Sequence, residues 1–457
     1  MPFTFYLGLY LITLTQVHTF DALSYILDVD RKPWPELFHP HHLAYGPLGA
    51  SIRSIALALG WQGSSAMLIQ AANALAGAAG VATFFSLARR ATGRVGLAAV
   101  GALLLGSSYA FWYYAVEVEV YTIASLFLII ALFLIIALLR RPSLALAAAL
   151  GCVQGLAVLF HQTNVLLCVP AGVALLLGDR GQQTGDMRRA VSRYWLLMAY
   201  IIPLALIVAG SYLWVGLGVS GFRSWGELSA WMEGYARTGW WGGAVDGAKL
   251  SGLGVGLSRT VSPPGWEFLA IGLLVVLLAN LGGLRRAPRA LVWALLAWLL
   301  TYGAFFLWWE PDNIEFWIAS LPPFYLLGWG LGGRSQESLV DGRPAQPGAG
   351  DAGDQPGGDP AARRRANRPP AGDHRSAGGP QLAGRPAGCA RWPAGTLPAL
   401  LREPRERHLA EPGDDGEWRR LVGGMRDAAW SGGSGDLQRL RGPGRRRGDA
   451  AHARAAG

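Results

Sequence analysis

The sequence predicts an all-α fold, a polytopic transmembrane helix bundle, and three observations lead to it. Of the 457 residues, 52% are hydrophobic and only 15% are charged, where an average soluble domain has about 25% charged residues. The apolar residues gather in ten segments of nearly membrane-spanning length, and basic residues recur in alternate loops between these segments. We therefore expect about ten membrane spans within residues 1–333.

The ten segments are long apolar runs with few charged residues. They are residues 3–17, 64–88, 95–111, 119–139, 143–159, 163–178, 195–216, 266–283, 290–308 and 316–331. Several are shorter than the roughly 20 residues of a typical spanning helix. The number of segments is therefore better defined than their ends.

The basic residues predict the orientation of the bundle. Cationic side chains in short loops are retained on the cytoplasmic side of a membrane. With ten apolar segments, the arginines of the short loops all fall in alternate loops. They are Arg89, Arg90, Arg94, Arg140, Arg141, Arg180, Arg188, Arg189, Arg193, Arg285, Arg286 and Arg289. The N-terminus is then cytoplasmic, and the outward loops are 18–63, 112–118, 160–162, 217–265 and 309–315.

Residues 334–457 differ in composition from the membrane part. They are rich in Gly, Pro, Ala, Arg and Asp, and contain no Lys, Ile, Phe or Tyr. Such a segment cannot build a core, so we expect either a disordered tail or the out-of-frame translation of a G+C-rich gene. More than half of the net charge of +10 lies there. The overall basicity therefore does not indicate a nucleic-acid partner.

The first outward loop offers a carboxylate close to the membrane. Asp21 follows the first apolar segment, where partial desolvation would make it a better proton acceptor. The plainer interpretation is that Asp21 caps a helix over residues 22–27, since Asp is a preferred N-cap. Both interpretations stay open on the loop alone.

A histidine cluster follows in the same loop, as His39-Pro40-His41-His42. Imidazole is a common metal ligand, but the spacing is not that of a helical histidine pair. The cysteines Cys152, Cys168 and Cys389 are not spaced as ligands either. We expect no cofactor, and the spacing does not support a divalent cation. Hydrogen bonds to a phosphate are the more plausible use of these side chains.

Further polar residues border the other outward loops. Glu117 and Glu119 stand among aromatic residues at the start of an apolar run, where a carboxylate is costly unless it faces water or a partner. His161 to Asn164 form a polar turn between two apolar segments, and turn chemistry alone would explain Asn and Thr. The segment 308–317 again combines acids with aromatic rings, which are also ordinary interfacial anchors.

These motifs together resemble the GT-C superfamily of membrane glycosyltransferases, in particular bacterial proteins related to protein O-mannosyltransferases. The resemblance lies in Asp21 after the first apolar segment, the His39-Pro40 segment with Gly46-Pro47-Leu48, and Glu119-Val120-Tyr121. The turn at residues 161–164 and the segment 313–323 complete it.

The resemblance implies transfer of a sugar from a polyprenyl-phosphate donor to an acceptor hydroxyl outside the cytoplasm. Asp21 would be the catalytic general base of an inverting reaction. The implied setting is a multi-pass protein of a bacterial cytoplasmic membrane, with lipid, the lipid-linked donor and a glycan, lipid or protein acceptor as partners. We expect the substrates to contact Asp28, His39, His41, Glu117, Glu119, Tyr121, His161, Asn164 and Glu315.

Two departures and two rival functions accompany this resemblance. His41-His42-Leu43-Ala44-Tyr45 stands before Gly46, where related proteins more often read Pro-Gly directly, and no apolar segment follows residue 331. A transporter or flippase would place ionisable residues within its spans and show internal repeats. A non-catalytic membrane scaffold would leave Asp21 and Glu119 on opposite sides of the fold.

Overall fold

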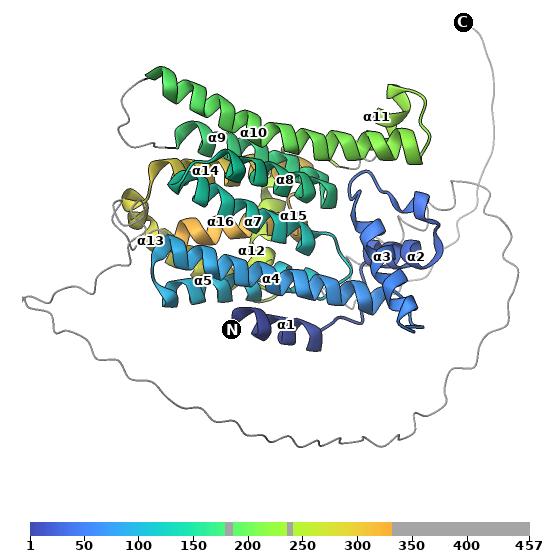
Figure 1. The fold of residues 1–457 in the computed structure, drawn as a ribbon. Helices are drawn as coiled ribbons and strands as arrows, with labels where there is room; N and C mark the ends of the chain where they lie inside the picture. The colour runs from blue at the N-terminus through green and yellow to red at the C-terminus, as the bar shows by residue number, and fades with distance from the viewer. Residues whose placement is uncertain (179–185, 235–240, 331–457) are drawn as a thin grey trace, which may run out of the picture. The chain divides into compact units, whose positions relative to one another are not determined.

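The computed structural model describes residues 1–178, 186–234 and 241–330 of the protein (Figure 1). This part of the chain is helical and contains no β-strand. The tail predicted over residues 334–457 lies outside the described residues, so its expected disorder stays a prediction. The same holds for the predicted cytoplasmic residue Arg180.

The N-terminal half contains one long helix among several shorter ones. Its α-helices are α1 (Pro2–Ile12), α2 (Phe20–Arg31), α3 (Tyr45–Ala58), α4 (Ala66–Thr92), α5 (Val95–Ser107), α6 (Tyr109–Ala115), α7 (Tyr121–Arg140), α8 (Leu144–Phe160) and α9 (Cys168–Leu177). Short 3-10 helices occur at η1 (Trp34–Leu37) and η2 (Gln162–Leu167). The outward loop predicted over residues 18–63 is thus largely helical.

The C-terminal half of the described chain follows the same plan. Its α-helices are α10 (Asp186–Leu213), α11 (Trp225–Glu233), α12 (Gly247–Val261), α13 (Glu267–Asn280), α14 (Arg289–Trp309), α15 (Ile314–Trp317) and α16 (Leu321–Tyr325). Between and after them lie η3 (Trp214–Val219), η5 (Leu281–Arg286), η6 (Ile318–Ser320) and η7 (Leu326–Gly330). The segment predicted as one span over 316–331 is a series of short helical pieces.

All ten predicted segments fall on helices, but fewer have the length of a span. In the described residues, four helices are long and apolar enough to cross a membrane: α4, α7, Arg193–Val219 and α14. A fifth span results if α5 and α6, bent by 64° at Ser108, are taken together. Shorter apolar helices occupy α1, α8, Gln162–Leu177 and α13. About ten spans therefore stays a prediction.

Helix α7 lies at the centre of the bundle. It packs against α4 on one side and α8 on another, and α8 in turn packs against α10 (Figure 1). In α7, 61% of the most apolar window is buried, against 17% for the window in Arg193–Val219. Large apolar side chains such as Trp195, Leu206 and Phe268 are exposed on α10 and α13. Such surfaces suit contact with lipid tails.

The close contact between α8 and α10 depends on two glycines. A Cβ on Gly151 would lie 2.1 Å from the carbonyl oxygen of Tyr200, and one on Gly155 would lie 2.9 Å from Ile207. The two glycines are four residues apart on one face of α8, the spacing that lets membrane helices approach closely. Their missing side chains bring the two backbones together.

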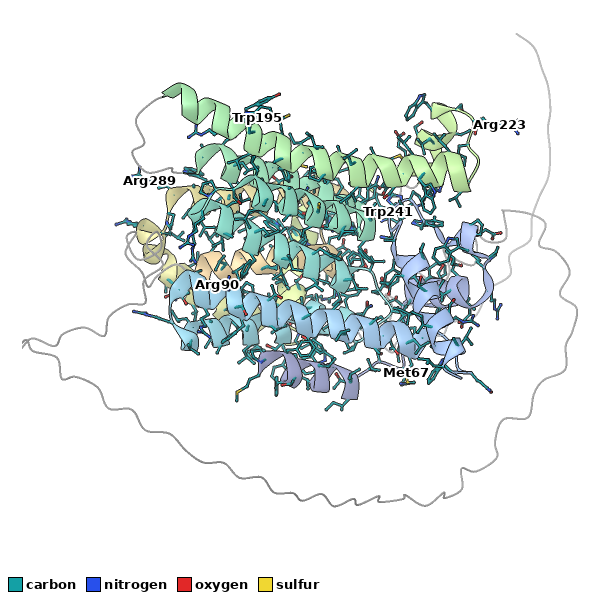
Figure 2. The ribbon with its side chains drawn as sticks, viewed as in Figure 1. Met67, Arg90, Trp195, Arg223, Trp241 and Arg289 are labelled. Carbon is teal, nitrogen blue, oxygen red and sulfur yellow. The ribbon has the colours of Figure 1, made fainter. Side chains whose placement is uncertain are left out.

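The predicted cytoplasmic residues gather at one end of the helices. Figure 2 shows Arg90 and Arg289 at the end away from α2 and α3, whereas Met67, in the first turn of α4, lies near α2 and α3. The guanidinium of Arg140 donates a hydrogen bond to the carbonyl of Arg90 at 2.7 Å. The basic loops after α4 and α7 thus share one end of the bundle.

Candidate functional site

Three segments that are far apart in sequence bring carboxylates together at the end of the bundle opposite Arg90 and Arg289. Asp21 lies in the first turn of α2, Glu119 between α6 and α7, and Glu315 in α15. They are close enough to interact, since the charges of Glu315 and Asp21 add to burial in raising the pKa of Glu119. The separation that a scaffold would require between Asp21 and Glu119 is absent.

The plainer interpretation, that Asp21 caps α2, is wrong. The N-cap is Thr19, whose hydroxyl accepts a hydrogen bond from the backbone N–H of Ala22 at 3.0 Å. Asp21 instead lies in the first helical turn, where the helix dipole favours a negative charge. Its side chain is on the exposed side of α2, yet desolvation by the surrounding protein raises its pKa. The carboxylate of Asp21 is exposed and therefore open to a substrate.

Glu119 is almost completely buried, with 1% of its surface exposed. One carboxylate oxygen accepts a hydrogen bond from the hydroxyl of Thr19 at 2.6 Å, and the other has no partner among the described residues. Burial raises its pKa well above the ordinary range, and the Thr19 hydrogen bond only partly opposes this. Burial therefore favours the protonated form of Glu119 over the charged form.

The neighbouring Glu117 is fully buried and pairs with a histidine from the loop before α2. Its Oε1 lies 2.7 Å from Nδ1 of His18 and also accepts the backbone N–H of Val118. The residues 117–119 thus face the segment 18–19 through two side-chain contacts. Each contact joins residues about a hundred positions apart in the sequence.

An asparagine in α4 holds this loop in place. The side-chain amide of Asn73 donates hydrogen bonds to the carbonyl oxygens of Glu117 at 2.6 Å and Glu119 at 2.7 Å. One turn earlier, Gln70 donates to the carbonyls of Thr15 and Val116. Both amides are buried, so they satisfy carbonyl groups that water cannot reach.

Glu315 sits among hydrogen-bond donors. Asn313 donates to one carboxylate oxygen at 2.8 Å and Tyr114 to the other at 3.2 Å, and Tyr121 adds a further hydrogen bond. Burial nevertheless raises the pKa of Glu315 to about 7, helped by the charges of Asp21 and Glu310. Its charge therefore changes near neutral pH.

The predicted histidines form one stacked group beside this carboxylate cluster. The rings of His39 and His42 stack at 5.5 Å between centroids, and the ring of His42 lies 5.1 Å from that of His161. His161 also lies 4.9 Å from the ring of Tyr121. Burial lowers the pKa of His39 to about 4 and that of His161 to about 3, so both rings are neutral at pH 7.

Backbone hydrogen bonds fasten this histidine group to the turn after α8. The N–H of Gln162 donates to the carbonyl of His41 at 3.0 Å, and the N–H of Ala44 donates to that of Leu159 at 2.9 Å. In the described residues, no group of three or more His, Cys, Asp or Glu side chains has an arrangement that could hold a metal ion. The histidines are therefore placed to pack and to hydrogen-bond.

A small cavity lies where the two groups meet. It has a volume of about 20 Å³, which is room for about one water molecule. Its polar lining comes from Tyr121, His161, Thr163, Asn164 and Glu315, and its walls from Phe306 and Phe316. A sugar does not fit inside it. Asp21 is exposed and does not line this cavity.

The structure places the remaining predicted residues in different settings. Asn164 lines the cavity and donates from its amide to the carbonyl of Ala157 at 3.0 Å. Asp28 instead forms an ion pair with Lys32, one turn along the exposed side of α2, at 2.8 Å. Nothing in its contacts joins Asp28 to the carboxylate cluster.

Four residues of the site were not among the sequence-based candidates: His18, Thr19, Gln70 and Asn73. A usable signal exists for the last two. Gln70 and Asn73 are amides three residues apart near the start of an otherwise apolar helix, so they share one face of α4. His18 and Thr19 carry no such signal, because their partners are known only once the chain has folded.

Comparison with known proteins gives one match. Residues 46–185 match the family described as Protein O-mannosyl-transferase TMEM260 N-terminal domain. The name is that of a glycosyltransferase. The matched residues include Glu117, Glu119 and His161 and leave out His18, Asp21 and Glu315. No curated protein and no solved structure matches the chain. The match and the apolar helices together support a membrane protein related to glycosyltransferases.

Proposed function

We propose that this protein is a GT-C-type membrane glycosyltransferase that moves a sugar from a polyprenyl-phosphate donor to an acceptor hydroxyl. The observation that carries the proposal is the cluster of Asp21, Glu119 and Glu315, built from three segments around the region that matches the protein O-mannosyl-transferase family. The name of that family makes mannose the first sugar to test and a protein hydroxyl the first acceptor. A glycan or lipid hydroxyl is the alternative acceptor.

In this proposal Asp21 is the general base. It takes the proton of the acceptor hydroxyl while the oxygen attacks the anomeric carbon, and the bond from that carbon to the phosphate oxygen breaks with its electron pair leaving on the phosphate. Asp21 is the exposed member of the cluster, and its raised pKa improves it as a proton acceptor. Glu315 is partly exposed and suits hydrogen bonding to the sugar, whereas Glu119 is buried behind it.

The reaction is proposed for the non-cytoplasmic face of a bacterial cytoplasmic membrane. Arg90 and Arg289 lie at one end of the helices, and the carboxylate cluster adjoins α2 and α3 at the other (Figure 2). Retention of cations on the cytoplasmic side would place the cluster outside. The donor can then stay in the lipid while its sugar reaches Asp21. We propose no metal, cofactor or nucleic acid for the reaction.

The test is replacement of Asp21 by Asn, which keeps the size of the side chain and removes its basicity. We expect kcat for transfer from a polyprenyl-phosphate-linked mannose to fall by roughly 10²- to 10⁴-fold, the usual contribution of a positioned general base. Expression and insertion into the membrane should not change. The matched control is Glu36→Gln, which neutralises an exposed carboxylate elsewhere in the same loop. Full activity of Asp21→Asn would refute the assignment of the base.

A further inference from the structure

The pair formed by His18 and Glu117 has the geometry of an oriented imidazole. Glu117 is fully buried, and its Oε1 is fixed by the N–H of Val118 as well as by Nδ1 of His18. The second oxygen of Glu117 has no partner in the described part of the chain. The contact of 2.7 Å turns Nδ1 of His18 toward this carboxylate and leaves Nε2 on the other side of the ring.

The other nitrogen of that ring is available to a ligand. The side chain of His18 is 19% exposed, and its Nε2 forms no hydrogen bond within the described residues. The titratable groups near His18 and its partner are Glu119, whose carboxylate accepts a hydrogen bond from the adjacent Thr19, Asp21 three residues on, and Tyr45 and Tyr113, which interact with the charge of Glu117. None of these other groups is basic.

The other cations of the first outward segment are engaged or distant. Lys32 forms an ion pair with Asp28 at 2.8 Å, and Arg53 forms one with Asp30 at 2.9 Å. Arg31 is exposed but lies ten residues beyond Asp21 on the same helix, which is about 15 Å at the rise of an α-helix. Of the basic side chains in this segment, His18 is three residues from Asp21 and keeps one ring nitrogen open within the described residues.

We propose that His18, held by Glu117, donates a hydrogen bond from Nε2 to the phosphate of the lipid donor. This inference rests on the proposed function, and it assigns to His18 the contact with the phosphate leaving group in the same site. When the bond between the anomeric carbon and the phosphate oxygen breaks, its electron pair stays on that oxygen. The Nε2–H group stabilises the added charge, while Asp21 handles the proton of the acceptor on the other side.

Binding can be measured without any transfer reaction. The probe is farnesyl phosphate in detergent micelles, followed by tryptophan fluorescence of the full-length protein, with farnesol as the phosphate-free comparison. We expect His18→Ala to weaken binding of farnesyl phosphate by roughly 10- to 100-fold, the range for a charged hydrogen bond, and to leave farnesol binding unchanged. Inorganic phosphate as competitor shows whether the headgroup alone is recognised.

Three further variants make the result specific. Glu117→Gln should weaken farnesyl phosphate binding less than His18→Ala, because the ring loses its counter-charge and keeps its hydrogen bond. His18→Gln should recover part of the affinity, because its amide can donate from a similar position. Gln16→Ala is the control, since Gln16 is exposed in the same loop.

The outcomes separate this inference from the proposed function. If His18→Ala binds farnesyl phosphate as tightly as the unaltered protein does, the inference is overturned, whatever the transferase assay shows. If binding falls and the unaltered protein transfers no sugar, the phosphate site stands and the proposed reaction is wrong. Where transfer is active, His18→Ala should raise KM for the donor and leave KM for the acceptor unchanged. Asp21→Asn should mainly lower kcat.

Discussion

The ionisation of Glu315 depends on where the fold puts it. Its pKa is raised from the ordinary value of 4.5 to about 7, first by burial and then by the charge of Asp21. Between these two values the folded protein binds a proton that the unfolded chain does not bind. Stability from this group is therefore fully present below about pH 4.5 and is lost as the pH rises through about 7.

Replacement of Glu315 by Gln should remove this pH dependence. We expect the melting temperature of the unaltered protein in detergent to decline between pH 5 and 8 more steeply than that of Glu315→Gln. The difference in free energy is at most roughly 3 kcal/mol across this range. Because the charge of Glu315 also raises the pKa of Glu119, the comparison reports the effect of Glu315 together with its influence on Glu119. Parallel curves would show that Glu315 is ionised throughout.

Asn73 should matter for stability and for the site together. Its replacement by Ala leaves the buried carbonyls of Glu117 and Glu119 without their donor, which we expect to cost roughly 2–5 kcal/mol. The measurement is the melting temperature, together with donor binding. Ser125→Ala is a suitable control, because the Ser125 hydroxyl is buried without a hydrogen-bond partner. If Asn73→Ala is as stable as the unaltered protein, the loop 116–120 does not depend on the hydrogen bonds from Asn73.

At the scale of elements, the crossing of α8 and α10 depends on the absence of a side chain. Replacement of Gly151 by Ala places a Cβ against the Tyr200 carbonyl, so the helices must separate. We expect a loss of roughly 1–3 kcal/mol, as for other overpacked contacts, seen as a lower melting temperature. Gly172→Ala in α9 is the control, since its Cβ would meet nothing within 4 Å. Equal stability of the two variants would contradict this view of the crossing.

Hydropathy located the apolar helices well. Each of the ten apolar segments overlaps a helix, because the burial of apolar side chains and helical hydrogen bonding both depend on residues close in sequence. The lengths were less predictable. The span expected over 3–17 is an 11-residue α1, and the region 316–331 is broken at several points. Pro322 and Pro323 interrupt the second of these, since proline lacks the N–H that a continuous helix needs.

Amphipathic helices in the predicted outward loops were also missed. The helix α2 was expected only in part, and α11 and α12 were taken as loop. Each begins with a side-chain cap, from Thr19, Ser224 and Asp246 respectively. Such N-cap residues mark the start of a helix in the local sequence, but hydrophobic runs alone do not show them.

At the scale of the whole molecule, the two ends of the bundle should face opposite sides of a membrane. In a variant without Cys152, Cys168 and Cys389, single cysteines at Gln16 and Arg141 would report on the two ends, since both positions are exposed. We expect a membrane-impermeant maleimide to label Gln16→Cys in intact cells. Labelling of Arg141→Cys should require permeabilised cells. Labelling of both from the same side would refute the proposed orientation.

The sequence by itself determined the helical class, the places of the apolar segments and the recurrence of basic residues in alternate loops. These follow from hydropathy and charge, which act residue by residue along the chain. Only the tertiary structure decided that Asp21, Glu119 and Glu315 form one cluster, and that His18 pairs with Glu117 across 99 positions. Such contacts depend on how α2, α4, α7 and α15 pack, and long-range packing leaves no local signature in the sequence.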